Sequence, residues 1–312
     1  MTESGSVARV GYAPLTTMPH RLARIAAVCF AAFIAAPSLG AAQREPARSP
    51  AAGGHNARSA LVSSVFPVEQ PRGLLVTTGG WIYCANVQVL ARGAGYTLLC
   101  GRYAKDGYVA SNLRARRHVD WGNSDYLATF ASEITDLHRR VGGELVLLGV
   151  SYSGFGVATL ASHHPEIRPD KLIVVDSYLD LVARRRHAAS HLIGREIDLE
   201  TGGSPAALRA RSVDPAGLAT LVRHGTRMMV IWSISPAEKR LFRGATCARD
   251  ANAETLARLA RRLHRSVSGW VTTGEHGFDL WEHASAILNL HPPGKEVRFP
   301  PTGTVPPGSF CA

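Results

Sequence analysis

The sequence predicts an α/β protein with a mostly parallel central sheet flanked by helices. Short apolar runs of strand length alternate with longer segments in which apolar residues recur at helical spacing. This alternation is typical of parallel sheets, because two parallel neighbours need a long crossover connection between them. Two of the apolar runs also end in turns rich in glycine, which marks the point where a strand stops.

Each expected strand is an apolar run bounded by Gly, Pro or polar residues. These strands span residues 60–69, 73–77, 96–100, 145–148, 171–176, 228–232 and 267–271. The expected helices span 87–95, 125–141, 155–160, 253–263 and 278–290. From 179 to about 222 the rhythm breaks, which predicts a small cap inserted between two strands of the sheet.

Composition and charge narrow the class of protein. The 312 residues are 46% hydrophobic and 19% charged, which suits one sizeable core with a small cap. The formal net charge is +11, and all but four of the 35 basic residues are arginine. Such a charge can attract anionic surfaces or substrates, but the arginines are spread along the chain, which favours an ordinary solvated surface. The arginines have no aromatic residues interleaved with them, so we expect no nucleic-acid partner.

The N-terminal region has the layout of an export signal. Arg21 and Arg24 precede an apolar run over 25–36, Pro37 breaks that run, and small residues continue to Ala42. Residues 1–42 are therefore expected to be an N-terminal extension and signal peptide, which makes the protein periplasmic or secreted. The run is too short for a comfortable membrane span, so no stable membrane anchor is expected.

The rest of the chain divides by composition. Residues 43–59 are rich in Ala, Gly, Pro and Arg and predict a flexible linker. Residues 60–292 hold the alternating strands and helices of one domain, and 293–312 form a Pro-rich tail.

Four cysteines remain once the leader is set aside, and an even number in an exported chain favours disulfides. They are Cys84, Cys100, Cys247 and Cys311. A pair of Cys247 with Cys311 would clamp the tail, with Cys84 and Cys100 as the complement. The alternative is that Cys84 and Cys100 are buried free thiols.

The stretch from 144 to 166 carries the strongest motif. A short apolar run leads into the turn Gly149-Val150-Ser151-Tyr152-Ser153-Gly154, and helical apolar spacing follows. A strand, a sharp turn with serine at its apex and a helix make up a nucleophile elbow, whose usual pattern is G-x-S-x-G. Ser153 replaces the last glycine, but it is still a small residue. The alternative interpretation is a strand-to-helix connection without chemistry.

A second glycine turn lies upstream, at Gly79-Gly80, directly after the strand 73–77. Where serine is the nucleophile, such a turn supplies one half of an oxyanion hole. Gly80 or Trp81 would donate one backbone N–H, and Tyr152 would donate the other. The alternative is a tight turn with a structural role only.

The order of these features resembles the α/β-hydrolase superfamily over residues 60–292. The resemblance rests on Thr78-Gly79-Gly80-Trp81, on the turn 149–154 and on Gly274-Glu275-His276-Gly277-Phe278-Asp279 after the last expected strand. It implies an α/β-hydrolase fold with Ser151 as nucleophile and His276 as general base. A serine hydroxyl needs such an imidazole to accept its proton.

The carboxylate that would orient His276 has more than one candidate. In the superfamily it usually follows the strand read here as 228–232, where Glu238 is the first carboxylate. A known alternative places it after an earlier strand, where Asp176 stands without a gap. We favour Asp176 over Glu238, with Asp250 and Asp180 behind them. The alternative role for Asp176 is to cap a helix or stabilise a loop.

Together these features predict an exported serine hydrolase that cleaves carboxylic esters by acyl transfer. The expected partner is a small-molecule or lipid-like ester, with no cofactor and no metal ion. Thioester or amide hydrolysis by the same triad is the nearest alternative. A protein of this fold that binds a ligand without turnover is the alternative from another class. The sequence does not define the oligomeric state.

Overall fold

The structure is a computed structural model of the chain. It describes residues 61–78, 81–103, 124–186, 194–195, 197–198, 201–233, 267–272 and 277–297. The expected signal peptide, the linker, the helix at 253–263 and the end of the Pro-rich tail lie outside these ranges.

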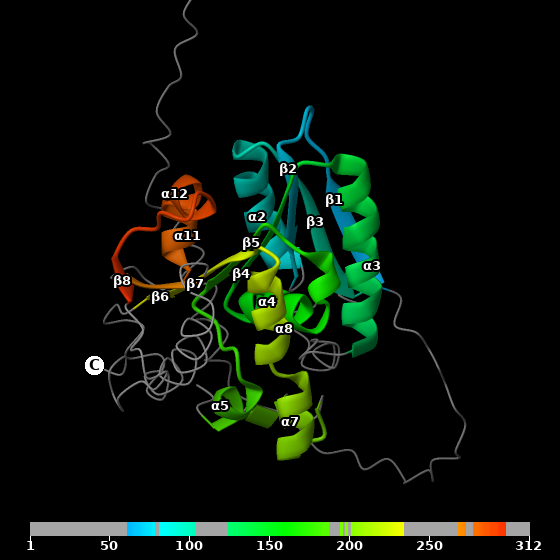
Figure 1. Ribbon diagram of the computed structural model, residues 1–312, viewed down its shortest axis with the longest axis vertical. Coiled ribbons are helices and arrows are strands. Elements are labelled where there is room, and N and C mark those ends of the chain that lie inside the picture. Colours follow the sequence, from blue (N-terminus) through cyan, green and yellow to red (C-terminus); the bar gives the residue numbers. More distant parts are fainter. Residues whose placement is uncertain are drawn as a thin grey trace, which may run out of the picture. The chain divides into compact units, whose positions relative to one another are not determined.

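The described strands form one sheet in the order β1-β3-β2-β4-β5-β6-β7-β8 (Figure 1). They are β1 Leu61–Phe66, β2 Gly73–Thr77, β3 Tyr96–Tyr103, β4 Glu144–Val150, β5 Lys171–Val175, β6 Arg227–Ser233, β7 Val267–Thr272 and β8 Lys295–Val297. The pairs from β3 to β7 are parallel, whereas β1 and β8 pair antiparallel at the two edges. The fold class expected from the sequence is confirmed.

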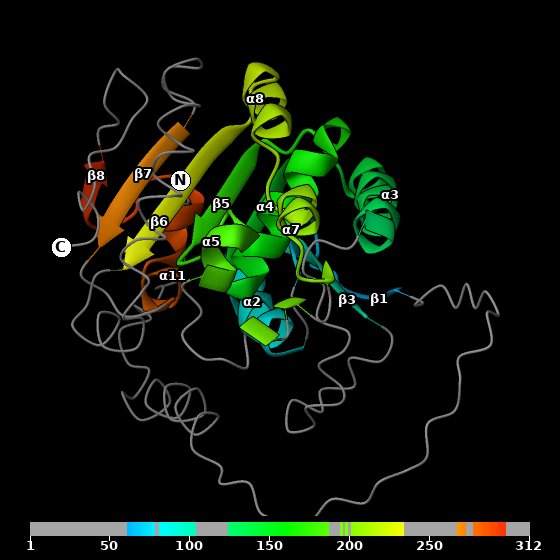
Figure 2. The same ribbon diagram turned by 90° about the horizontal axis from the view of Figure 1, so that it is seen from below.

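Helices cover both faces of this sheet (Figures 1 and 2). They are α2 Trp81–Gly93, α3 Ser124–Val141, α4 Tyr152–His163, α5 Leu181–Arg186, α7 Pro205–Arg211, α8 Pro215–Arg223, α11 Phe278–Glu282 and α12 Ala284–Leu288. One core packs α3, α4 and α8 against alternate strand residues such as Leu145 and Leu147. The other packs α2, α11 and α12 against the intervening residues, such as Val146 and Leu148. Because both faces are covered, the central strands are continuous apolar runs.

The stretch expected to form the cap divides into two parts. Helices α5 and α7 make a small cluster of their own, in which Leu181 and Leu208 pack against Phe155 of α4. Helix α8 instead joins the core that α3 and α4 form against the sheet, and a Cβ atom on Gly217 would lie 2.6 Å from the carbonyl carbon of Ser162. Leu218 and Leu221 of α8 are buried in that core, so α8 packs with the helices that flank the sheet.

Three element boundaries differ from the sequence expectation. Helix α2 begins at Trp81, ahead of the apolar spacing that starts at 87. The expected helix 278–290 is broken at His283, whose φ of −121° is not helical, into α11 and α12. Strand β8 pairs with β7 inside the stretch from 293 that was expected to be an irregular tail, because the edge of β7 offers unpaired backbone groups.

A disulfide joins Cys84 in the first turn of α2 to Cys100 in β3, with 5.7 Å between their Cα atoms. Both residues are buried. This confirms the paired interpretation of Cys84 and Cys100 over free thiols. Cys247 and Cys311 lie outside the described residues, and their pairing stays a prediction.

Within the described ranges, no helix combines the length and the apolar character needed to cross a membrane.

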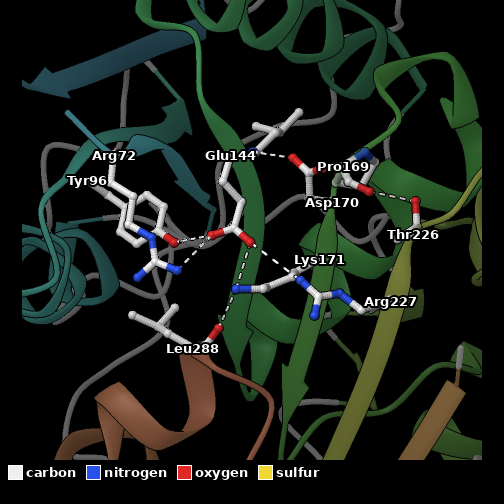
Figure 3. A network of polar contacts seen from close by, with 10 residues as sticks. Arg72, Tyr96, Glu144, Pro169, Asp170, Lys171, Thr226, Arg227 and Leu288 are labelled. Atoms are coloured by element: carbon white, nitrogen blue, oxygen red, sulfur yellow. Dashed lines mark hydrogen bonds and ion pairs between the residues drawn. The ribbon is translucent and has the colours of Figure 1, made fainter.

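The amino-terminal edge of the parallel strands is held by a charge network around Glu144 (Figure 3). Its carboxylate lies 2.7 Å from Nζ of Lys171 and 3.4 and 3.6 Å from the guanidinium groups of Arg72 and Arg227. It also accepts a hydrogen bond from the hydroxyl group of Tyr96. Lys171 is only 3% exposed, so its ammonium group depends on these contacts.

The network reaches beyond the strands as well. Lys171 also donates to the carbonyl of Leu288 at the end of α12, over 2.7 Å. On the other side, Asp170 accepts the backbone N–H of Leu145 over 2.7 Å. The cluster therefore ties β4, β5 and β6 to each other and to the closing helices.

The network also shifts two pKa values. Burial by itself would raise the pKa of Glu144, but hydrogen bonds from Lys171 and Tyr96 and the charges of Lys171 and Arg72 lower it overall. Burial, together with the neighbouring Glu144 carboxylate, raises the pKa of Tyr96, so its hydroxyl stays protonated.

Replacing Glu144 by Gln should lower the free energy of unfolding by about 3 kcal/mol near pH 7, because the buried ammonium group of Lys171 loses its counter-charge. The folded pKa of Glu144 lies below the unfolded value, so the wild-type stabilisation is complete above about pH 4.3 and is lost as the pH falls through the lowered value. Urea unfolding at neutral and acidic pH measures both effects. The difference between the two proteins should shrink in acid.

The matched control is Asp136→Asn, which removes an exposed pair with Arg139 on α3. It should change the free energy of unfolding by less than about 0.5 kcal/mol. An equal loss in both variants would contradict a special role for the network.

Candidate active site

The turn between β4 and α4 holds Ser151 in a strained conformation. Its φ is 54° and its ψ is −122°, in a region that residues with a side chain rarely adopt. The backbone N–H of Ser151 donates to the carbonyl of Val175 in the neighbouring strand over 2.8 Å. Ser151 is half-buried, so its hydroxyl stands at the carboxyl-terminal edge of the sheet without being sealed in the core.

Small residues around this turn let strand and helix approach closely. A Cβ atom on Gly149 would lie 2.6 Å from the backbone nitrogen of Gly154, and one on Gly154 would lie 2.7 Å from Cβ of Ser177. The glycines at 149 and 154 are therefore required by backbone and side-chain contact. This is the geometry expected of a nucleophile elbow.

Ser153, which replaces the last glycine of the usual pattern, has its own partner. Its side chain is fully buried, and its hydroxyl lies 2.8 Å from Oγ1 of Thr77 at the end of β2. The serine that departs from the motif thus links the first turn of α4 to the end of β2. No sequence pattern identifies this pair, because its members are 76 positions apart.

Asp176 follows β5 directly and contacts Gly277. Its φ of 48° is a second strained value at this edge, and its N–H donates to the carbonyl of Ile231 over 2.9 Å. Oδ2 of Asp176 accepts the backbone N–H of Gly277 over 2.7 Å. Gly277 is the residue directly after His276 in the sequence.

Gly277 is also close to the nucleophile turn. It is buried with a φ of 72°, and a Cβ atom there would lie 2.8 Å from Cγ1 of Val150, the residue before Ser151. Gly277 therefore lies between Asp176 and Val150. Since β4 and β5 pair Val150 with Val175, the structure brings Ser151, Asp176 and the end of the 274–277 loop to one place on the sheet.

The other candidates fall into two groups. Gly80, His276, Glu238 and Asp250 lie outside the described residues, so their roles stay predictions. Trp81 and Tyr152 are the first residues of α2 and α4, where backbone N–H groups have no partner within their own helix.

Asp180 is occupied in another way. Its Oδ1 accepts the N–H groups of Val182 and Ala183 over 2.7 and 3.3 Å, which caps the start of α5. Asp180 therefore has a capping role, whereas the bond from Gly277 to Asp176 is compatible both with a triad acid and with the loop-stabilising alternative.

In the part of the chain that the structure describes, no group of His, Cys, Asp and Glu side chains is arranged to hold a metal ion.

No protein-family profile matches this sequence, and no curated protein sequence matches it. Solved structures resemble it at low identity. Carboxyl esterase 2 from the mycorrhizal fungus Tuber melanosporum is 12% identical, with a TM-score of 0.45, over 76% of this chain and 88% of that one. An acylaminoacyl peptidase from Pyrococcus horikoshii is 17% identical, with a TM-score of 0.49, over 70% of this chain and 36% of that one. A peroxisomal α/β-hydrolase from Saccharomyces cerevisiae is 13% identical, with a TM-score of 0.40, over 74% and 80%.

The arrangement of this chain itself defines its class. A mostly parallel sheet covered on both faces, a strained serine between a central strand and the next helix, and a cap after β5 constitute an α/β-hydrolase fold. The resemblance inferred from the sequence motifs is therefore confirmed at the level of the fold.

Replacing Gly149 by Ala should destabilise the protein by about 3 kcal/mol or prevent folding, because the new methyl group meets the backbone of the α4 first turn. Gly93→Ala is the matched control, since a Cβ atom on Gly93 meets nothing within 4 Å. It should be neutral or slightly stabilising, by up to about 1 kcal/mol. Thermal unfolding followed by circular dichroism compares the two. Equal melting temperatures would show that the turn is looser than the structure indicates.

Proposed function

We propose that this protein is an exported serine hydrolase that cleaves carboxylic esters by acyl transfer. The observation that carries the proposal is the strained Ser151 beside Asp176, whose carboxylate holds the N–H of Gly277, next to His276. Strain of this kind persists only where the surrounding structure enforces it, and it is concentrated at functional sites.

In the proposed reaction, Oγ of Ser151 attacks the carbonyl carbon of the ester while His276 accepts the hydroxyl proton. The tetrahedral intermediate collapses, the carbon–oxygen bond to the alcohol breaks, and His276 returns the proton to the leaving alcohol. Water then attacks the acyl-enzyme with His276 as base, which releases the carboxylic acid and restores Ser151.

Asp176 would orient the imidazole and stabilise its positive charge. Its hydrogen bond to the N–H of Gly277 supports this role, because the same carboxylate then fixes the chain beside His276. Glu238, the alternative acid, lies outside the described residues. The N–H of Tyr152 and that of Gly80 or Trp81 would stabilise the oxyanion, at the starts of α4 and α2.

The proposal also includes export of the enzyme and the class of its substrate. The signal-peptide layout of residues 1–42 supports a periplasmic or secreted enzyme, and the Cys84–Cys100 disulfide is compatible with an oxidising compartment. A small-molecule or lipid-like ester is the proposed substrate. A thioester or amide would react through the same steps with a different leaving group.

Wild-type protein should be labelled covalently by a fluorophosphonate probe, and Ser151→Ala should lose that labelling completely, since the probe reacts only with an activated serine. Gel fluorescence after incubation with the probe gives the readout. Ser132→Ala, which changes an exposed serine on α3, is the control and should label like wild type. Folded wild-type protein that stays unlabelled would instead support a ligand-binding protein without turnover.

Asp176→Asn should lower kcat for a p-nitrophenyl ester by about 10⁴-fold, the effect expected when the acid of a serine triad becomes an amide. The amide oxygen of Asn still accepts the N–H of Gly277, so the fold should be kept. The kcat of Glu238→Gln should stay within about threefold of wild type, since a carboxylate that does not orient His276 should have little effect on the reaction. If only Glu238→Gln loses activity, Asp176 is not the acid.

A further inference from the structure

The three consecutive arginines of α5 have different surroundings. Arg185 forms an ion pair with Asp198, with Nη2 to Oδ2 at 2.9 Å, and this pair raises the pKa of its guanidinium group. Arg186 is exposed to solvent. Arg184 is half-buried, and its side chain makes no hydrogen bond or ion pair in the part of the chain that the structure describes. The sequence alone gives no reason to separate these three residues.

The guanidinium of Arg184 is held in place by an aromatic ring. Its Cζ atom lies 4.5 Å from the ring centroid of Tyr178, which is close enough for a cation–π contact. Its Nη1 atom is buried and, among the residues that the structure describes, donates to no acceptor. A buried donor without an acceptor is unfavourable, and a cationic one more so. The contact with Tyr178 orients the guanidinium group but leaves this donor unused.

The nearby carboxylates are committed to other partners. Asp180 caps α5 through the N–H groups of Val182 and Ala183, and Asp198 binds Arg185. No carboxylate among the described residues lies within ion-pair distance of Arg184, so the charge of its guanidinium is not neutralised by them.

Arg184 lies on a helix that packs beside the candidate site. Tyr178 follows Asp176 by two residues, and Leu181 and Val182 of α5 belong to the same apolar cluster as Tyr152 and Phe155 in the first turn of α4. Helix α5 therefore packs on the turn that carries Ser151. Figure 2 shows α5 beside α4 and next to the end of β5.

We propose that Arg184, oriented by Tyr178, binds a carboxylate group carried by the substrate. This inference rests on the proposed hydrolase function and specifies its substrate class: esters that carry a second, ionised carboxyl group. A planar guanidinium pairs with a carboxylate through parallel N–H···O bonds, and in a half-buried site such a pair is stronger than at the open surface. The substrate carboxylate would supply the acceptor that the described residues do not.

The test compares esters that differ only by this charge. Mono-p-nitrophenyl adipate and p-nitrophenyl hexanoate have acyl chains of equal length, one ending in a carboxylate and the other in a methyl group. The pair 4-acetoxybenzoate and phenyl acetate places the carboxylate on the alcohol side instead. In wild type, the ester pair with the larger ratio of kcat/KM for the charged over the neutral ester shows on which side of the scissile bond the carboxylate is bound.

Arg184→Met should lower kcat/KM for the preferred charged ester by about ten- to hundredfold and leave its neutral counterpart within about twofold. Arg184→Lys should retain part of the preference, since it keeps the charge but not the planar fork. Arg186→Met, which removes an exposed arginine from the same helix, is the control and should keep the wild-type preference. An equal loss for charged and neutral esters, or no loss for either, would overturn the proposal.

A binding measurement separates this proposal from the proposed function. Adipate should raise the melting temperature of wild type and of Ser151→Ala, but not that of Arg184→Met. If no ester is hydrolysed and adipate still stabilises only the proteins that contain Arg184, the hydrolase function fails and the carboxylate site stands. If adipate stabilises Arg184→Met as well as wild type, the carboxylate site fails, whatever the turnover.

Discussion

The approach of β4 to the first turn of α4 is the constraint on which the rest of the site depends. The backbone passes so closely at Gly149 and Gly154 that a side chain at either position meets neighbouring atoms. That approach forces Ser151 into a positive φ and holds its hydroxyl at the carboxyl-terminal edge of the sheet. The hydroxyl of Ser153 in the same turn pairs with that of Thr77 of β2, so the turn is also bound to the neighbouring strand.

The two edges of the sheet at which the parallel strands begin and end carry different kinds of residues. At the amino-terminal edge, Glu144 gathers cations from three strand starts, and Lys171 connects them to α12. At the carboxyl-terminal edge, Ser151 and Asp176 both carry strained backbone. Strained residues persist where surrounding structure over-determines them. The cores on both faces and the charge network at the opposite edge hold the strands in place around these residues.

The cap is joined to the site through a single apolar cluster. Phe155 of α4 packs against Leu181 of α5 and Leu208 of α7. A shift of the cap would therefore change the packing of α4 close to Ser151. Under the proposed function, this arrangement would let residues of α5 contribute to substrate choice without taking part in bond cleavage. Arg184 lies on α5 of the cap, and its guanidinium group stacks on the ring of Tyr178. It is two residues further along the chain than Val182, whose N–H donates to Asp180 at the start of α5.

Local patterns in the sequence determined the strands, most helices and the serine turn, because apolar spacing and glycine placement are set by neighbours along the chain. The order Gly79-Gly80, Ser151, His276 also led to the fold class by resemblance. The tertiary structure alone decided that Asp176 reaches Gly277, that Asp180 caps α5, that Ser153 pairs with Thr77 and that Arg184 differs from Arg185 and Arg186. Those facts depend on contacts between distant segments, which no local pattern records. The break at His283 and the packing of α8 on the sheet follow from the same cause.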